Sequence, residues 1–531
     1  MFDTIILNGI VIDGTGRKRK KVDIGINNED IITLGELKKA KGLKIIDAKG
    51  LYVTPGFIDL HTHSDFALLL DGSAESFARQ GVTTQIIGNC GFSCAPLKKP
   101  EYLRRNIFGY IKPYKANWTK LNGYLEILEK KGLGTNVIAL IGHAAIRSYV
   151  MGYENRSATI KEVKKMTEIL EESIEQGAFG LSTGLEYFPG NIASDDEITS
   201  LLKVIKKYDC IYATHVRNRD EKFASGFSEA FRVAEKMGIK LQISHAVPKY
   251  GAPKMASDWF LEELSKYGKT TDIACDVIPY VWGPTSVTAI LPNTVLKNNT
   301  NTIVKILKDK QVREQIKNQK RPIWLLFRDR CWEKICIYHS IKHPEFIGKS
   351  LIEISKKLGV TPFDAIIDFL IAEGENMFSA LMIGKIKNEK DLKKIINHPL
   401  VGVISDGMSL SIKGKLKNVR WSPGCYGWVP RFIKEYTGEG KNLALEAGIA
   451  KITGFPSKRL GLKRRGLIKS GYKADIVIFS FDDFNDKSNF LKPGIYPDGL
   501  KYVLINGEVV INNCEDTGKL AGKVLKISIN N

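Results

Sequence analysis

Eight short apolar runs recur through this chain of 531 residues, and stretches of helix length separate most of them. Such alternation predicts an α/β fold in which the strands run parallel. The runs lie at 53–60, 82–88, 137–142, 178–182, 211–214, 241–244, 272–276 and 401–405. Eight strands with intervening helices predict a (β/α)8 barrel of the TIM type.

The last two runs are separated by a gap that is long for a barrel connection. We therefore expect an insertion at about 285–395, before the last barrel strand, with helices such as 350–358 and 361–373. The composition, 43% hydrophobic and 26% charged residues, is that of an ordinary globular protein. The length suffices for one large domain and a smaller one.

Both ends of the chain contain short strand-like runs, among them 4–12 and 474–479. Domain termini often lie close together in space. We therefore expect residues 1–52 and 462–531 to combine into one small β-sandwich. Residues 53–461 would then form the barrel with its insertion.

Several of the central runs end in side chains that bind metals. His61 and His63 stand one residue apart, so in a strand both imidazoles would leave on the same face. Cys90, His215, His245 and Asp406 follow other runs. Each ending has an ordinary explanation of its own, such as a backbone hydrogen bond, an Asp-Gly turn or a buried thiol. In a parallel barrel, however, the C-terminal strand ends converge, and together they predict one metal centre.

The net charge of +21 raises the question of nucleic-acid binding. The densest basic run, residues 17–21, follows turn-like residues and precedes a strand-like segment, so we expect it to cap a hairpin in solvent. No zinc-finger spacing, aromatic RNA-binding motif or basic tail is present. We predict no nucleic-acid partner, although the positive field would favour an anionic substrate.

The sequence contains no run of about 18 apolar residues, so we predict no membrane partner. Its start lacks a basic segment followed by a long apolar core, so we predict no signal peptide. The eight cysteines are scattered without paired spacings, which is typical of a reduced, cytoplasmic protein. The expected partner is a small molecule, and the oligomeric state stays open, with a homo-oligomer among the alternatives.

Seven segments resemble the amidohydrolase superfamily and, more closely, its N-acyl-D-amino-acid deacylase (D-aminoacylase) branch. Residues 55–63 are similar to the superfamily's first-strand signature, and residues 81–96 to a branch segment with a ligand cysteine. The others lie at 180–187, 214–218, 243–245, 461–468 and 471–477. The resemblance covers nearly the whole chain. It implies a zinc-dependent amide hydrolase with a β-sandwich beside the barrel.

Carried over position by position, the resemblance implies a centre that holds one or two zinc ions. The implied ligands are His61 and His63 for one metal, His215 and His245 for the second, Cys90 within the site as a bridge or otherwise, and Asp406. Zinc lowers the pKa of its bound water to about 7. Asp406 would take the proton as the hydroxide attacks the amide, then return it to the leaving amine. The leading substrate is an N-acyl-D-amino acid.

The sequence also departs from its relatives. Residues 182–186 contain no lysine that could bridge two metals as a carbamate, which argues against a dihydroorotase-like or dihydropyrimidinase-like centre. Many branch members carry lysine where Val247 stands, and His-Pro-Arg where Ser422-Pro423-Gly424 stands. Both elements would recognise a substrate carboxylate. The remaining candidates for substrate binding are Tyr187, Lys249, Ser286 and Arg431.

Some roles stay open on the sequence alone. Glu186 either supports the metal site or is structural, and His143 either contacts the substrate or belongs to the core. Cys94 is expected to pack rather than to bind metal. Two other functions remain: hydrolysis of a cyclic amide or imide, and a catalytically silent homologue that serves as an assembly scaffold. Loss of metal ligands would mark the scaffold, and all six candidates are present.

Overall fold

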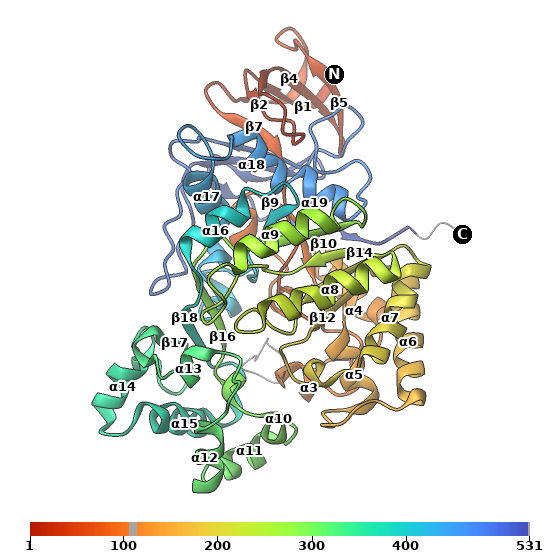
Figure 1. The fold of residues 1–531 in the computed structure, drawn as a ribbon. Helices are drawn as coiled ribbons and strands as arrows, with labels where there is room; N and C mark the ends of the chain where they lie inside the picture. Colours follow the sequence, from red (N-terminus) through yellow and green to blue (C-terminus); the bar gives the residue numbers. More distant parts are fainter. Residues whose placement is uncertain (106–113, 529–531) are drawn as a thin grey trace.

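Two sheets of parallel strands form the centre of the molecule in this computed structural model, which describes residues 1–105 and 114–528 (Figure 1). The first sheet has the spatial order β24 (Val524–Leu525), β10 (Asn136–Ala139), β9 (Val82–Ile87) and β8 (Phe57–Asp59). The second has the order β11 (Ile141–Gly142), β12 (Gly180–Gly184), β13 (Ile211–His215), β14 (Lys240–Ile243), β15 (Ile273–Val277) and β19 (Val401–Val403). The predicted α/β class is confirmed.

Backbone hydrogen bonds also join the edges of these two sheets. Past β19, the amide of Asp406 donates to the carbonyl of His61 at 3.1 Å, and Thr62 pairs with Gly407 in parallel. Elsewhere, the amide of Phe179, directly before β12, donates to the carbonyl of Ala139 in β10 at 2.9 Å. The segment that carries His61 and His63 is therefore fixed between β9 and the end of β19.

Amphipathic helices follow the strands. The Thr159 hydroxyl and the Glu162 carboxylate form a capping box at the start of α6, and Ser194 caps α7. In α6 the buried residues recur at helical spacing, as at Met166, Leu170 and Ile174. These helices are α4 (Leu121–Lys131), α5 (His143–Met151), α6 (Ile160–Glu175), α7 (Asp195–Lys207), α8 (Phe223–Met237), α9 (Ala256–Tyr267) and α16 (Glu389–Ile396). Shorter or later ones are α1 (Ala67–Leu70), α2 (Glu75–Ala78), α3 (Glu101–Arg105), α17 (Gly424–Tyr436), α18 (Leu445–Lys451) and α19 (Gly454–Arg459).

Strands from the N- and C-terminal parts of the chain combine in a second region, toward the top of Figure 1. One sheet there has the order β5 (Asp30–Gly35), β4 (Asp23–Asn27), β1 (Phe2–Leu7) and β6 (Gly42–Asp47). The other has the order β23 (Glu515–Asp516), β22 (Glu508–Asn512), β21 (Leu500–Ile505), β20 (Ile476–Phe479), β7 (Tyr52–Pro55), β2 (Ile10–Val11) and β3 (Lys20–Lys21). Strands from opposite ends of the chain meet where β20 pairs with β7. The side chains of Ile6, Ile24, Val53, Ile476 and Leu504 share one buried apolar cluster.

Two features of the chain ends differ from expectation. The single strand expected at 4–12 is wrong, because Asn8 adopts φ +62° and turns the chain between β1 and β2, which then enter different sheets. Near its C-terminal end the chain also rejoins the central region, because β24 pairs with β10 in a parallel sheet.

The segment before β19 forms a separate lobe, at the lower left of Figure 1. Its antiparallel sheet has the order β16 (Trp282–Ser286), β18 (Leu381–Lys385) and β17 (Ile335–His339). Its helices are α10 (Asn293–Leu296), α11 (Thr300–Ile306), α12 (Lys310–Lys317), α13 (Leu325–Arg328), α14 (Leu351–Leu358) and α15 (Pro362–Glu373). The lobe has its own buried apolar cluster. We expected helices here, and the three strands were not foreseen.

No helix in the described part of the chain has the length and apolarity that crossing a bilayer requires.

Candidate metal centre

His61 and His63 lie in the extended segment that follows β8. The strand ends at Asp59, but the alternation continues: the Thr62 amide and hydroxyl both donate to the carbonyl of Ile86, at 3.0 and 2.8 Å. Thr62 therefore faces β9, while the two imidazoles turn together toward the interior. Both histidines are buried.

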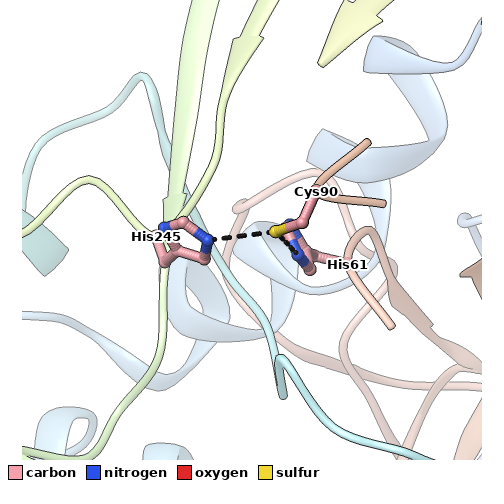
Figure 2. Close-up of side chains that lie close together, drawn as sticks. All are labelled: His61, Cys90 and His245. Atoms are coloured by element: carbon pink, nitrogen blue, oxygen red, sulfur yellow. Dashed lines mark hydrogen bonds between the residues drawn. The ribbon is translucent and has the colours of Figure 1, made fainter. Parts of the chain in front are cut away.

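The Cys90 thiol lies at the meeting point of three imidazoles. Its Sγ is 3.3 Å from Nε2 of His61, 3.3 Å from Nε2 of His245 and 3.6 Å from Nδ1 of His215. Figure 2 shows the sulfur between the rings of His61 and His245. The four residues come from the ends of four different parallel strands, which is where a barrel enzyme builds its site.

Asp406 forms a second group with the two histidines of the first strand. Its Oδ1 is 3.1 Å from Nε2 of His63 and 3.5 Å from Nε2 of His61. The first group is His61, Cys90 and His245, and the second is His61, His63 and Asp406. Within each group the potential ligand atoms lie within 4.8 Å of one another. His61 belongs to both, so the groups are contiguous.

The backbone is unusual at three of these residues. Cys90, His245 and Asp406 adopt φ values of +52°, +38° and +47°, in the left-handed region that residues with a Cβ rarely occupy. Such strain persists where the surrounding structure holds it and clusters at functional sites. Here it turns each side chain inward directly after its strand.

Glu186 fixes the orientation of His215. Its Oε2 accepts a hydrogen bond of 2.7 Å from Nε2 of His215, which leaves the lone pair of Nδ1 facing Cys90. Nζ of Lys249 donates to Oε1 of Glu186 at 2.7 Å. Although burial alone would raise the pKa of Glu186, Lys249 and His215 hold it well below its usual range. Histidine ligands of metals are commonly held by such a carboxylate.

Arg219 is the main residue at the centre that sequence reasoning missed. Its Nη1 donates to Nδ1 of His245 at 2.8 Å, and its Nη2 lies 3.4 Å from Nε2 of His215. The guanidinium is buried, and its nearest carboxylate is Glu186 at 3.6 Å. No periodic pattern marks this residue, because it lies in a loop after β13.

Two further buried groups also escaped prediction. The Asp276 carboxylate accepts a hydrogen bond from the amide of His245 at 2.7 Å, and burial raises its pKa to about 7. Lys387 is buried, and its Nζ donates to the carbonyl of Tyr280 at 3.3 Å. Burial and the charge of Arg219 lower the pKa of Lys387 to about 7. Both residues extend the layer of charged groups around the histidines.

The donor set fits a zinc ion. Imidazole nitrogen, thiolate sulfur and carboxylate oxygen are its usual ligands. Burial lowers the pKa of His61 to about 3 and that of His215 to about 4, so both imidazoles are neutral and can donate their lone pairs. Burial also raises the pKa of the Cys90 thiol well above its usual range, so a nearby cation is needed to form the thiolate. The positive charges of Arg219 and Lys387 near His245 oppose a cation.

The four substrate-binding candidates lie in different settings. The Tyr187 ring packs edge-on against His215, with centroids 4.7 Å apart. Ser286 and Tyr187 both line a small cavity of about 70 Å³. Lys249 is paired with Glu186, as described above. Arg431 donates to the carbonyl of Pro279 and stacks over Tyr280, so its contacts lie outside the group of ligand-type side chains.

His143, whose role was open, and Cys94, which was expected to pack, both lie in the core. Nε2 of His143 is 2.7 Å from Glu197, which also pairs with Arg147, and all three are buried. Cys94 is fully buried, and its carbonyl accepts a hydrogen bond from the indole of Trp118. Neither belongs to a described group of potential metal ligands.

A larger cavity, of about 410 Å³, lies beside this centre. Glu186 and Asp220 line it on the side of the parallel strands, and Leu291, Gln319 and Ile323 on the side of the inserted lobe. The lobe thus supplies one wall of the space next to the histidines.

Comparison with known proteins places the chain among hydrolases. A profile of the amidohydrolase family matches residues 44–274 and 419–511. An N-acyl-D-aspartate deacylase from Alcaligenes xylosoxydans xylosoxydans is 29% identical, over 98% of this chain and 95% of that protein. A D-aminoacylase structure, described with a binuclear metal centre, one-metal activation and second-metal attenuation, matches with a TM-score of 0.82 and 27% identity, over 99% of this chain and 100% of that one. A second match is the zinc complex of N-acyl-D-glutamate deacylase from Bordetella bronchiseptica with a phosphonate that mimics the tetrahedral intermediate. Its TM-score is 0.83 and its sequence identity is 26%, over 99% of this chain and 100% of that one.

Proposed function

The chain belongs to the amidohydrolase family, and on that premise we propose that it is a zinc-dependent enzyme that deacylates N-acyl-D-amino acids. The observation that carries the proposal is the position of Cys90, whose Sγ lies within 3.6 Å of three imidazoles from three other strands. The similarity to N-acyl-D-aspartate and N-acyl-D-glutamate deacylases over nearly the whole chain supports the substrate class.

Six side chains would hold one or two zinc ions in this proposal. They are His61, His63, Cys90, His215, His245 and Asp406. A bound zinc ion polarises the amide carbonyl and lowers the pKa of water at the centre to about 7. Glu186 and Asp276 orient the ligands from behind, through the hydrogen bonds to His215 and to the amide of His245.

Asp406 is the group best placed to move the proton. Its side chain is 20% exposed, whereas those of His61 and His63 are 1% exposed, so it is the one of these three that faces open space. Although burial opposes its charge, His63 and His61 lower the pKa of Asp406 to about 2, so it is ionised at neutral pH. It would accept the proton of the attacking water and return it to the leaving nitrogen.

The finer architecture is part of the same proposal. We infer that the two parallel sheets close into a (β/α)8 barrel through the bonds between Asp406 and His61 and between Phe179 and Ala139. Residues 1–52 and 462–531 would form the β-sandwich beside it, and residues 53–461 the barrel with its insertion.

The substrate class is tested by a screen on zinc-loaded protein. We expect release of amino acid from N-acetyl-D-amino acids, little or no release from their L-enantiomers, and no opening of hydantoin or dihydrouracil. Paired enantiomers are matched controls, because they differ only in the configuration at one carbon. Opening of the cyclic amides alone would replace the proposal with a cyclic amidase. Zinc-loaded protein that hydrolyses none of them would point to a scaffold.

Arg219 gives a second prediction, on metal affinity. Arg219→Gln removes a buried positive charge from the side of His245, so we expect zinc to bind about tenfold more tightly, because even a partly screened charge this close repels a cation. Competition with a fluorescent chelator measures this. Arg217→Gln is the matched control, because Arg217 lies two residues away and pairs with Glu229. Equal zinc affinity in the wild type and Arg219→Gln would contradict the expected repulsion.

A further inference from the structure

A second, smaller cavity of about 70 Å³ adjoins the metal centre on the far side of Tyr187. Tyr187 contacts His215 on one side and packs against Phe92, two residues after Cys90, on the other. A single water needs only about 10–15 Å³ of such space, so a carboxylate with the carbon that carries it fits this cavity. Its lining combines aromatic rings with an arginine and hydroxyl groups, rather than with acidic side chains.

The arginine is Arg105, at the end of α3. Its guanidinium stacks on the ring of Tyr153, 3.8 Å from the centroid, and lies 5.6 Å from that of Phe378. One N–H donates to the carbonyl of Leu296, while the buried Nε has no acceptor. Among the described residues, no carboxylate pairs with Arg105. A guanidinium held among rings without an anion is costly, because burial removes its hydration, and burial lowers the pKa of Arg105.

Hydroxyl groups from β16 and the turn after it complete the lining. The buried Thr285 hydroxyl has no hydrogen-bond partner in the described structure. Beside it, the hydroxyls of Ser286 and Thr288 lie 2.7 Å apart. An arginine and the unpaired Thr285 hydroxyl beside a small space are what a carboxylate needs, since the guanidinium offers paired N–H groups.

None of the six candidate metal ligands lines this cavity, so a carboxylate bound beside Arg105 lies away from the scissile amide. Tyr187, which lines the cavity, is in contact with His215, and the rings of Tyr153 and Phe188, which also line it, lie 6.1 Å apart. We propose that this cavity binds a second carboxylate of the substrate, distal to the amide, and that Arg105 thereby selects dianionic N-acyl-amino acids. The proposal rests on the proposed function. The distal carboxylate can come from the amino-acid side chain or from a dicarboxylic acyl group.

The test compares substrates that differ by one charge. We expect the wild type to prefer N-acetyl-D-glutamate to N-acetyl-D-glutamine by roughly tenfold to a hundredfold in kcat/KM, the usual effect of a charge-assisted hydrogen bond. Arg105→Met should abolish most of that preference through KM, with the glutamine compound changed less than threefold. Thr285→Val should lower the preference partially. N-succinyl-D-leucine against N-acetyl-D-leucine tells whether the acyl group supplies the carboxylate.

Lys99→Met is the control, since it removes an exposed positive charge close to α3 in sequence. A wild type indifferent to both distal carboxylates, or equal losses for acid and amide in Arg105→Met, would overturn the proposal. If Arg105→Met does not fold, Arg105→Lys and Thr285→Val decide it, because each keeps the volume but weakens the donor set. If no N-acyl-amino acid is hydrolysed, the proposed function is wrong, but the proposal for the cavity can still be tested by binding. Calorimetric binding of N-acetyl-D-glutamate and N-acetyl-D-glutamine to the wild type and Arg105→Lys then tests the cavity alone.

Discussion

Asp406→Asn is expected to lower kcat by about 10²–10⁴ and to leave KM within a few-fold, the scale of a lost general acid–base group. Asparagine keeps the size and one oxygen acceptor of aspartate, so the contacts to His61 and His63 can persist. It cannot accept the proton of the attacking water. Steady-state kinetics with an N-acetyl-D-amino acid measures both parameters.

The variant also loses a charged metal ligand, so the zinc content must be measured in the same preparation. Kinetics at saturating zinc separate a slower reaction from an empty site, because added zinc would restore activity only in the second case. Near wild-type kcat in fully loaded Asp406→Asn would remove Asp406 from the proton-transfer role.

Several parts of the molecule follow from local sequence rules. The alternation in His61-Thr62-His63 predicts two imidazoles on one side, and the structure places both beside Asp406. The expected helix at 350–358 has a Ser350 cap with Glu353 three residues later, and α14 begins at Leu351. The predicted family and its resemblance to D-aminoacylases are confirmed. The assignment of the six metal ligands stays a prediction.

Other parts depend on contacts that no local pattern encodes. Arg219 reaches His245 because its loop folds back, with the amide of Lys249 donating to the Arg219 carbonyl. Arg105 reaches Tyr153 through a contact between segments 48 residues apart, which the sequence of α3 does not reveal. β24 has two residues, and its pairing with β10 joins segments far apart in the sequence, which no local pattern predicts. In each case tertiary structure decides the position.

Cys90→Ala is expected to weaken zinc binding by more than about 100-fold and to abolish most activity. Its Sγ is the atom that brings His61, His215 and His245 together, and the alanine variant would lose the one thiolate ligand among these imidazoles. Removal of a ligand should cost more than the 10–100-fold typical of the groups that support ligands. Elemental analysis after dialysis against a weak chelator measures the zinc retained.

Cys94→Ala is the matched control for the thiol. Cys94 is four residues away and equally buried, so its removal creates a similar small cavity and a similar loss of stability. We expect it to keep its zinc and its activity, because the contacts described for Cys94 lie on the side of Trp118 rather than among the histidines. Equal zinc content in the two variants would exclude Cys90 from the metal site. Retention of zinc by Cys90→Ala would leave His61, His63 and Asp406 as the metal-binding group, since these three lie within reach of one ion without the thiol.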